Sequence, residues 1–155
     1  MSNRIAQIEL DEASLAAGNA NVEHERRVAV FDLIEGNNFE VIGASAGPYA
    51  LYLSAEDARL SIRVAGADGA DVCTHHVALA SFRRLIKDYF MVCESYYAAI
   101  RDATPSQIEA IDMGRRGLHN EGAEALAKAL EPHFKVDFET ARRLFTLVCA
   151  LHARG

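Results

Sequence analysis

The strongest constraint on the fold is a change of hydrophobic period near residue 79. Before it, from residue 39 onwards, apolar side chains recur at every second position, as in the run Leu-Ser-Ile-Arg-Val at residues 60–64, which is typical of strands with one face in water. After it, apolar positions follow the i, i+3, i+4 spacing of amphipathic helices. We therefore expect a sheet in the first half of the chain and helices in the second.

The first half is predicted to form an antiparallel meander with one helix. Alternation indicates strands over residues 4–10, 39–42, 49–53, 60–64 and 72–79. Short turns join the later strands, as at residues 66–69, and such loops connect antiparallel neighbours. The helix is expected over residues 22–35, with Asn21 as its cap. Its apolar stripe is expected to contain Val30, Phe31 and Ile34.

The second half is predicted to be all helical and to pack on the sheet. A long helix over residues 81–103 would be capped by Ser81, and the last helix by Asp137. Thr104-Pro105-Ser106-Gln107 has the form of a capping box with proline at the first helical position. The helix that it opens is expected to end at Gly114, with Asn120 capping another over residues 121–131. The result is a single α+β domain over residues 1–155, with residues 1–79 mainly strands plus the helix 22–35 and residues 80–155 helices.

The composition of the chain indicates its cellular compartment and excludes some classes of ligand. The 155 residues carry a formal net charge of -6, which argues against nonspecific binding to nucleic acid or to anionic membranes. No apolar run is long enough to span a bilayer, and the start of the chain lacks the apolar segment of a signal peptide. The three cysteines include no Cys-x-x-Cys pair. We therefore expect a cytoplasmic protein with reduced thiols, no metal site and no cofactor.

The densest group of polar functional side chains lies in residues 112–122. Arginine forks bind carboxylates and phosphates, histidine transfers protons near neutral pH, and glycines permit close approach by a ligand. The candidate ligand-binding residues are Gly114, Arg115, Arg116, Gly117, His119 and Asn120. A structural explanation competes with this one: Arg116 can pair with Asp112 at i, i+4, Arg115 can reach Glu109 or Asp112, and the glycines can break two helices.

Two functions follow from this Gly/Arg-rich helix junction. The leading hypothesis is a non-enzymatic module that binds an anionic small molecule or a protein carboxylate. The alternative is an enzyme acting on a phosphorylated or acyl small molecule, in which His119 is the general acid/base. Its Arg115 and Arg116 would stabilise negative charge, and Glu121 or Glu23 would orient the histidine. Common hydrolase and metalloprotease motifs are absent from the sequence, which leaves the choice between enzyme and binding module open.

Two histidine motifs have structural explanations. Glu23-His24-Glu25 resembles a set of metal ligands, but helix neighbours point about 100° apart and cannot share one ion. The functional possibility is that His24 meets His119 across a cleft. His75 and His76 are expected on opposite faces of a strand, where they do not chelate together.

The long helix over residues 81–103 combines arginines with several aromatic side chains. Arg83, Arg84 and Lys87, together with Arg142 and Arg143, support a weaker alternative, RNA binding. Because tyrosine is favoured in interfaces and the aromatic load exceeds one helical stripe, we expect a homodimer through this helix. The alternative is that these side chains all belong to the core of the chain itself.

The segments just described, and several others, resemble the uncharacterised bacterial protein family 0262. The resemblance is carried by residues 22–26, 82–90, 93–97, 103–105, 108–122, 138 and 140–147. The most specific run is Met-Gly-Arg-Arg-Gly-Leu-His-Asn at residues 113–120, and the weakest stretch lies between Gly43 and Val77. The resemblance implies a small cytoplasmic bacterial protein of unknown function. It implies no activity, ligand or catalytic residue.

Overall fold

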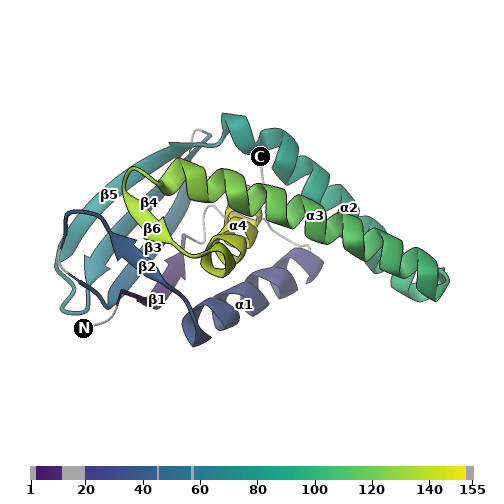
Figure 1. The fold of residues 1–155 in the computed structure, drawn as a ribbon, viewed down its shortest axis with the longest axis horizontal. Coiled ribbons are helices and arrows are strands. Elements are labelled where there is room, and N and C mark those ends of the chain that lie inside the picture. The colour runs from purple at the N-terminus through teal and green to yellow at the C-terminus, as the bar shows by residue number, and fades with distance from the viewer. Residues whose placement is uncertain (1–2, 12–19, 45, 57, 153–155) are drawn as a thin grey trace.

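The computed structural model describes residues 3–11, 20–44, 46–56 and 58–152. The elements follow one another as β1 (Ile5–Leu10), α1 (Ala20–Glu35), β2 (Phe39–Val41), β3 (Tyr49–Glu56), β4 (Arg59–Gly66), β5 (Asp71–Ala78), the short 3-10 turn η2 (Ala80–Phe82), α2 (Arg83–Asp102), α3 (Pro105–Leu130), β6 (Phe134–Val136) and α4 (Phe138–His152) (Figure 1). The α+β class is confirmed, with strands concentrated before residue 79 and helices after it.

The main sheet is mixed, not purely antiparallel. Its strand order is β1-β3-β4-β5, and β3, β4 and β5 form the expected antiparallel hairpins. The first strand, β1, pairs in parallel with β3, so the prediction of a purely antiparallel meander is wrong. The physical reason is the connection. The chain from β1 to β3 passes through α1 and β2, and a crossover of this length returns the chain to the end of the sheet from which it started.

A second, two-stranded sheet joins the two halves of the chain. The strand expected at residues 39–42 is present as β2, but it pairs with β6 instead of joining the meander. β6 has only three residues and lies between Pro132 and Asp137, where the sequence pattern predicts no strand. Three residues are too few to show a period, so only the tertiary pairing defines this strand.

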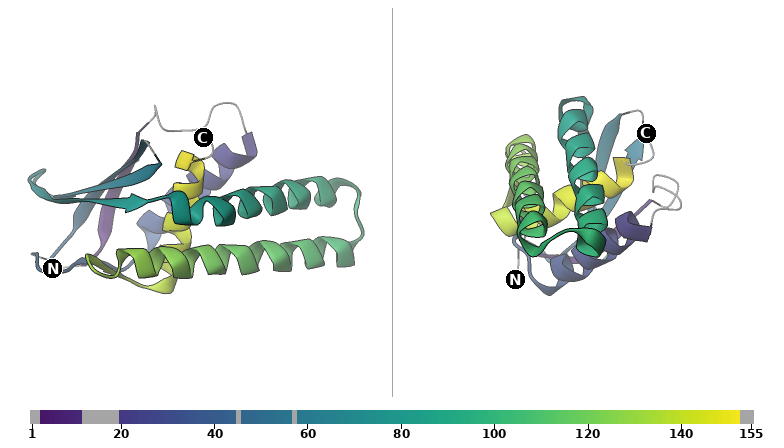
Figure 2. Two further views of the ribbon diagram at one scale, coloured as in Figure 1. Left: turned by 90° about the horizontal axis from the view of Figure 1, so that it is seen from above. Right: turned by 90° about the vertical axis from the view of Figure 1, so that its right-hand side faces the viewer.

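Helix α4 lies at the centre of the molecule. Every residue from Leu144 to Leu151 is buried, as expected for a helix that is covered on all sides. It contacts α3 and α1, and it also reaches α2 and β3 (Figures 1 and 2). Its first turn is capped as predicted, because Asp137 accepts a hydrogen bond from the Thr140 N–H at 3.2 Å. The core is thus the inner face of the main sheet closed over by α4 and its neighbours.

Helix α1 begins at Ala20, so Asn21 lies in its first turn and is not the cap. Its buried positions are Ala29 and Leu33. Phe31, expected in the buried stripe, is 65% exposed. Val30 and Ile34 are half-buried and pack against the core, as predicted, so Phe31 is the one residue of the expected stripe that faces solvent.

Helices α2 and α3 form an antiparallel hairpin that extends beyond the sheet (Figure 2, left). The capping box of α3 is confirmed: Thr104 Oγ1 accepts from the Gln107 N–H at 3.3 Å, and Gln107 Oε1 accepts from the Thr104 N–H at 3.0 Å. At the start of α2 the prediction is wrong. Ser81 lies in η2, and the N-cap residue Phe82 makes no side-chain capping bond.

The predicted helix junction in the Gly/Arg-rich segment does not exist. α3 is one continuous helix of 26 residues, so Gly114 does not end a helix and Asn120 does not cap one. A glycine inside a helix costs about 1 kcal/mol relative to alanine. Packing of α3 against both α2 and α4 offsets that cost, so the helix continues through its glycines.

Candidate functional site

Arg115 projects from α3 into the space between three helices. Its Nη2 lies 2.8 Å from Asp112 Oδ1 on the same helix, and its Nη1 lies 3.6 Å from Glu25 Oε1 on α1. The guanidinium also stacks over the ring of Tyr96 on α2, 4.4 Å from the centroid. Only 23% of the Arg115 side chain is exposed. Arg115 therefore connects α1, α2 and α3, and its charge is neutralised within the protein.

Glu25 has a second partner on α2. The Tyr97 hydroxyl donates a hydrogen bond to Glu25 Oε1. Burial, together with the adjacent Glu25 carboxylate, raises the pKa of Tyr97 well above its ordinary value. Tyr97 thus remains a protonated donor at any physiological pH, and the first turns of α1 are fixed to the α2–α3 hairpin.

Arg116 points to solvent. Its Nε and Nη2 bind Asp112 Oδ2 at 2.9 and 2.6 Å, as the i, i+4 spacing predicted. Its side chain is 67% exposed, whereas that of Asp112 is only 15% exposed. The Arg115 and Arg116 guanidiniums lower the pKa of the Asp112 carboxyl, with the Arg115 hydrogen bond as the largest cause. Asp112 is therefore ionised at neutral pH and holds both arginines.

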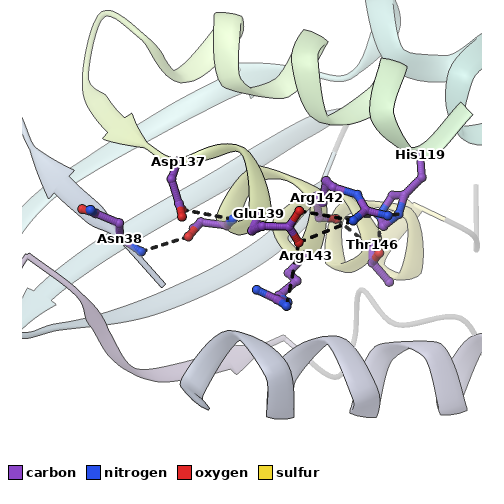
Figure 3. A network of polar contacts seen from close by, with 8 residues as sticks. Asn38, His119, Asp137, Glu139, Arg142, Arg143 and Thr146 are labelled. Atoms are coloured by element: carbon purple, nitrogen blue, oxygen red, sulfur yellow. Dashed lines mark hydrogen bonds and ion pairs between the residues drawn. The ribbon is translucent and has the colours of Figure 1, made fainter. Parts of the chain in front are cut away.

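His119 takes part in a network with α4 (Figure 3). Its Nε2 lies 2.7 Å from the Arg142 carbonyl oxygen and 2.9 Å from Thr146 Oγ1, and its Nδ1 lies 3.4 Å from Arg142 Nη2. A carbonyl accepts only, so Nε2 carries the proton and donates to it, which leaves Nδ1 to accept from the guanidinium. Every ring nitrogen of the neutral tautomer then has a partner.

Burial lowers the pKa of His119, and the positive charge of Arg142 lowers it further, against the opposing effect of the bond to the Arg142 carbonyl. The ring also lies between Tyr89 and Phe145, with centroid distances of 5.3 and 6.0 Å. His119 is therefore a neutral, half-buried histidine that links α3 to α4.

The residues proposed to assist His119 lie elsewhere. Glu23 pairs with Arg27 at 3.1 Å and with Arg26 at 3.7 Å on α1. Glu121 is exposed on α3. His24 is also exposed and takes no part in the His119 network. Among the described residues, no carboxylate lies within hydrogen-bonding distance of His119.

The remaining titratable side chains gather at no common centre. No group of three or more His, Cys, Asp or Glu side chains able to hold a metal ion occurs in the described ranges. His75 is half-buried and His76 exposed, which confirms that they face opposite sides of β5. His75 stacks on His133, with ring centroids 3.7 Å apart. All three cysteines are free, and burial raises the pKa of Cys149 well above its ordinary value.

The aromatic residues of α2 are largely occupied inside the molecule. Tyr89 contacts Phe145 and His119. The Tyr96 ring stacks against the Arg115 guanidinium, and the Tyr97 hydroxyl donates a hydrogen bond to Glu25. The aromatic surplus that suggested a dimer through this helix thus has an intramolecular explanation. The dimer itself stays a prediction.

The solvent face of the main sheet carries a hollow that no sequence motif predicts. Its volume is about 840 Å³, and it is lined by Glu9, Leu10, Asp11, Tyr52, Leu53, Ser54, Ser61, Arg63 and Thr74. Arg63 stacks over the Tyr52 ring at 4.0 Å and pairs with Asp71 at 3.0 Å. The alternating sequence pattern predicts that Ser61 and Arg63 lie on one face of β4. It does not predict that Arg63 lies opposite Tyr52 on the neighbouring strand β3.

The fold and the site define a small α+β protein in which a central helix is enclosed by a mixed sheet and a long helical hairpin. Most arginines of the described ranges, and His119, bond to other residues of the chain. Residues 2–154 match an uncharacterised protein family, and the chain belongs to this family, UPF0262. No helix in the described ranges is long and apolar enough to cross a membrane.

Relatives in alphaproteobacteria cover nearly the whole chain. A UPF0262 protein of Rhizobium meliloti is 57% identical over 152 residues, which is 98% of this chain and 96% of the relative. A UPF0262 protein of Agrobacterium fabrum shows the same identity and coverage, and one of Brucella anthropi is 58% identical over 153 residues, 98% of this chain and 95% of its own. No solved structure matches the chain.

Proposed function

We propose that the chain is a non-enzymatic module that binds an anionic small molecule or a protein carboxylate on the solvent side of α3. The binding residues would be Arg116, Gly117 and Asn120, called here the Arg116 face. The observation that carries the proposal is the state of Arg116, whose side chain is 67% exposed while its Nε and Nη2 are held by Asp112. The remaining N–H groups of the fork bond to no described residue and can donate to a ligand's oxygen atoms, and the guanidinium is already oriented.

Gly117 supports the same face. It is exposed in the middle of a helix, and nothing lies within 4 Å of the position that a Cβ would take. A glycine here destabilises the helix by about 1 kcal/mol relative to alanine, and no described contact at this position requires a glycine. A missing side chain beside Arg116 and before Asn120 would let a carboxylate-bearing partner lie flat on the helix.

Other residues of the Gly/Arg-rich segment would act by positioning. Arg115 shares Asp112 with Arg116 and thereby fixes the carboxylate that orients the exposed guanidinium. His119 anchors α3 on α4 through the Arg142 carbonyl and Thr146. Gly114 is exposed, with Val92 Cγ2 3.9 Å from the position of a Cβ.

The enzyme hypothesis receives less support. A general acid/base needs access to substrate and an environment that fits its proton transfers. Both nitrogens of His119 already have partners, its candidate orienting residues Glu23 and Glu121 are distant or exposed, and Arg115 is neutralised by Glu25 and Asp112. RNA binding is weaker again, because the formal net charge is -6.

The test is thermal unfolding of the wild type, Arg116→Ala and Asn120→Ala against inorganic phosphate, phosphorylated metabolites and carboxylates. A ligand at 100 times its Kd stabilises the native state by about 2.7 kcal/mol. We expect a shift of Tm in the wild type that is lost in both variants and retained in Arg84→Ala, an arginine on α2 whose side chain is 89% exposed. A shift that survives Arg116→Ala, or no shift with any anion, would contradict the proposal.

A further inference from the structure

The two edge strands of the main sheet differ in whether other parts of the chain bond to their outward backbone groups. At the β1 edge, the Asn37 side chain accepts from the Ile5 N–H at 2.7 Å and donates to the Ile5 carbonyl at 2.9 Å. Just before β1, the Asn3 carbonyl accepts from the Phe39 N–H at 2.9 Å. The chain that follows α1 therefore occupies backbone groups at this edge. The opposite edge is β5.

The register of β5 shows which of its backbone groups point outward. The Leu79 N–H donates to the Ala58 carbonyl at 2.8 Å, on the β4 side. In an antiparallel pair, successive residues turn their N–H and C=O groups alternately toward and away from the partner strand. His75 and Val77 therefore bond to β4, and the N–H and C=O groups of Thr74 and His76 point away from it. These outward groups pair with no other described residue.

Over residues 73–78 this edge lacks the usual protection against pairing. Natural edge strands are guarded by lysine, proline, inward charges or bulges. β5 has one irregularity at its start, where Val64 aligns with Cys73 but Ala65 aligns with Asp71. Beyond it, residues 73–78 read Cys-Thr-His-His-Val-Ala, with no Lys, Arg, Asp, Glu or Pro. A regular, uncharged edge of this kind is a template for another strand.

We propose that β5 pairs antiparallel with the β5 strand of a second copy of this chain, joining two main sheets into one continuous sheet. A strand is complementary to an antiparallel copy of itself, because donors and acceptors exchange across the two-fold axis. The one charged residue of β5, Asp71, lies at its end, so the two copies of Asp71 lie at opposite ends of the interface. Because each chain carries a net charge of -6, an uncharged edge is where two copies repel least.

The inner face of β5 adds an apolar contribution. Cys73 and Val77 are half-buried and face the core side of the sheet. A copy of β5 at 4.7–4.9 Å, the usual spacing of neighbouring strands, would place the same two side chains beside them and remove more apolar surface from water. This interface lies on the sheet and is independent of the Arg116 face on α3.

Hydrogen exchange measured by NMR at increasing protein concentration tests the proposal residue by residue. In the dimer the amides of Thr74 and His76 gain protection, about tenfold or more, because they become bonded across the axis. Those of His75 and Val77 are protected at every concentration, because β4 already accepts their protons. Unchanged exchange at Thr74 and His76 in a dimeric sample would overturn the proposal.

Sedimentation equilibrium of edge variants provides the second test. His76→Lys places a charge on an exposed residue at the centre of the free edge and should weaken the dimer about tenfold or more. Gln7→Lys adds the same charge at an exposed residue of β1, at the opposite edge of the sheet, and should leave the dimer unchanged. Circular dichroism checks that both variants are folded. A wild type that is monomeric up to millimolar concentration, or a dimer that His76→Lys does not weaken, would overturn the β5 interface. A dimer that His76→Lys leaves unchanged would favour an interface through α2 instead.

Discussion

At the scale of single residues, the glycines of α3 are of two kinds. An ideal Cβ on Gly122 would lie 2.3 Å from Phe145 Cζ, so the phenylalanine ring of α4 can pack here only because the side chain is missing. Gly117 has no such neighbour. The sequence shows the same residue type at both positions, and only the tertiary contacts separate a packing glycine from an exposed one.

This contrast predicts opposite effects for the same substitution. Gly122→Ala should lower the free energy of unfolding by about 1–3 kcal/mol, because the new methyl group overlaps the buried Phe145 ring. Gly117→Ala should raise it by up to about 1 kcal/mol through helix propensity. Urea denaturation of the two variants beside the wild type measures both changes. Equal effects would show that the Phe145 contact does not determine the choice of Gly122.

The histidines make stability depend on pH. Burial lowers the pKa of His119 and, together with the neighbouring His133 and His76, that of His75. An unfolded histidine titrates near pH 6.5, so below that pH the unfolded state binds more protons than the folded state. The stabilisation is complete above about pH 6.5 and is lost as the pH falls through the lower folded-state values.

We therefore expect the free energy of unfolding to fall between about pH 7 and pH 5, measured by urea titration at constant ionic strength. His119→Gln keeps a side-chain amide near the Arg142 carbonyl and cannot be protonated in this range, so its pH dependence should be shallower. Stability that rises on acidification from pH 7 would mean that protonated histidines are favoured in the folded protein.

At the scale of elements, polar side chains join parts of the chain that are distant in sequence. Asn37 closes the end of α1 onto β1: it donates to the Leu33 carbonyl at 2.7 Å as well as contacting both backbone groups of Ile5. Asn38 is exposed, and its backbone N–H, not its side chain, donates a hydrogen bond to Thr140 Oγ1 (Figure 3).

Replacing these neighbours separates the two roles. Asn37→Ala should cost about 1–3 kcal/mol of unfolding free energy, because it leaves backbone groups of β1 without their partner. Asn38→Ala keeps its backbone bond and should stay within about 0.5 kcal/mol of the wild type. Chemical denaturation with circular dichroism detection measures both. A similar cost for the two variants would contradict the assigned role of Asn37.

The elements that were predictable from sequence are those with local signals. The hairpins β3–β4 and β4–β5 follow from alternation and short turns, and the Thr104 and Asp137 caps follow from their sequence patterns. The parallel placement of β1 and the pairing of β2 with β6 depend on contacts between distant segments. The same limit explains the error in α3: glycines mark a helix break locally, but packing against α2 and α4 keeps that helix continuous.

At the scale of the whole molecule, the charged groups divide between the interior and the surface. The i, i+4 pair of Asp112 and Arg116 was predictable, whereas the contacts of Arg115 with Glu25 and Tyr96 required the arrangement of three helices. Arg115 and His119 hold α3 to its neighbours, and Arg116 remains on the outer side. Adjacent arginines that look equivalent in sequence are thus assigned different roles.

The most direct measurement of this division is the free energy of unfolding of Arg115→Ala and Arg116→Ala without ligand. We predict a loss of about 1–3 kcal/mol for Arg115→Ala, because Glu25 and Asp112 are left half-buried without their shared partner. For Arg116→Ala we predict a loss of no more than about 1 kcal/mol, because the Arg116 side chain is 67% exposed and Asp112 keeps its ion pair with Arg115. Comparable large losses in both variants would contradict the account and make Arg116 a structural residue like its neighbour.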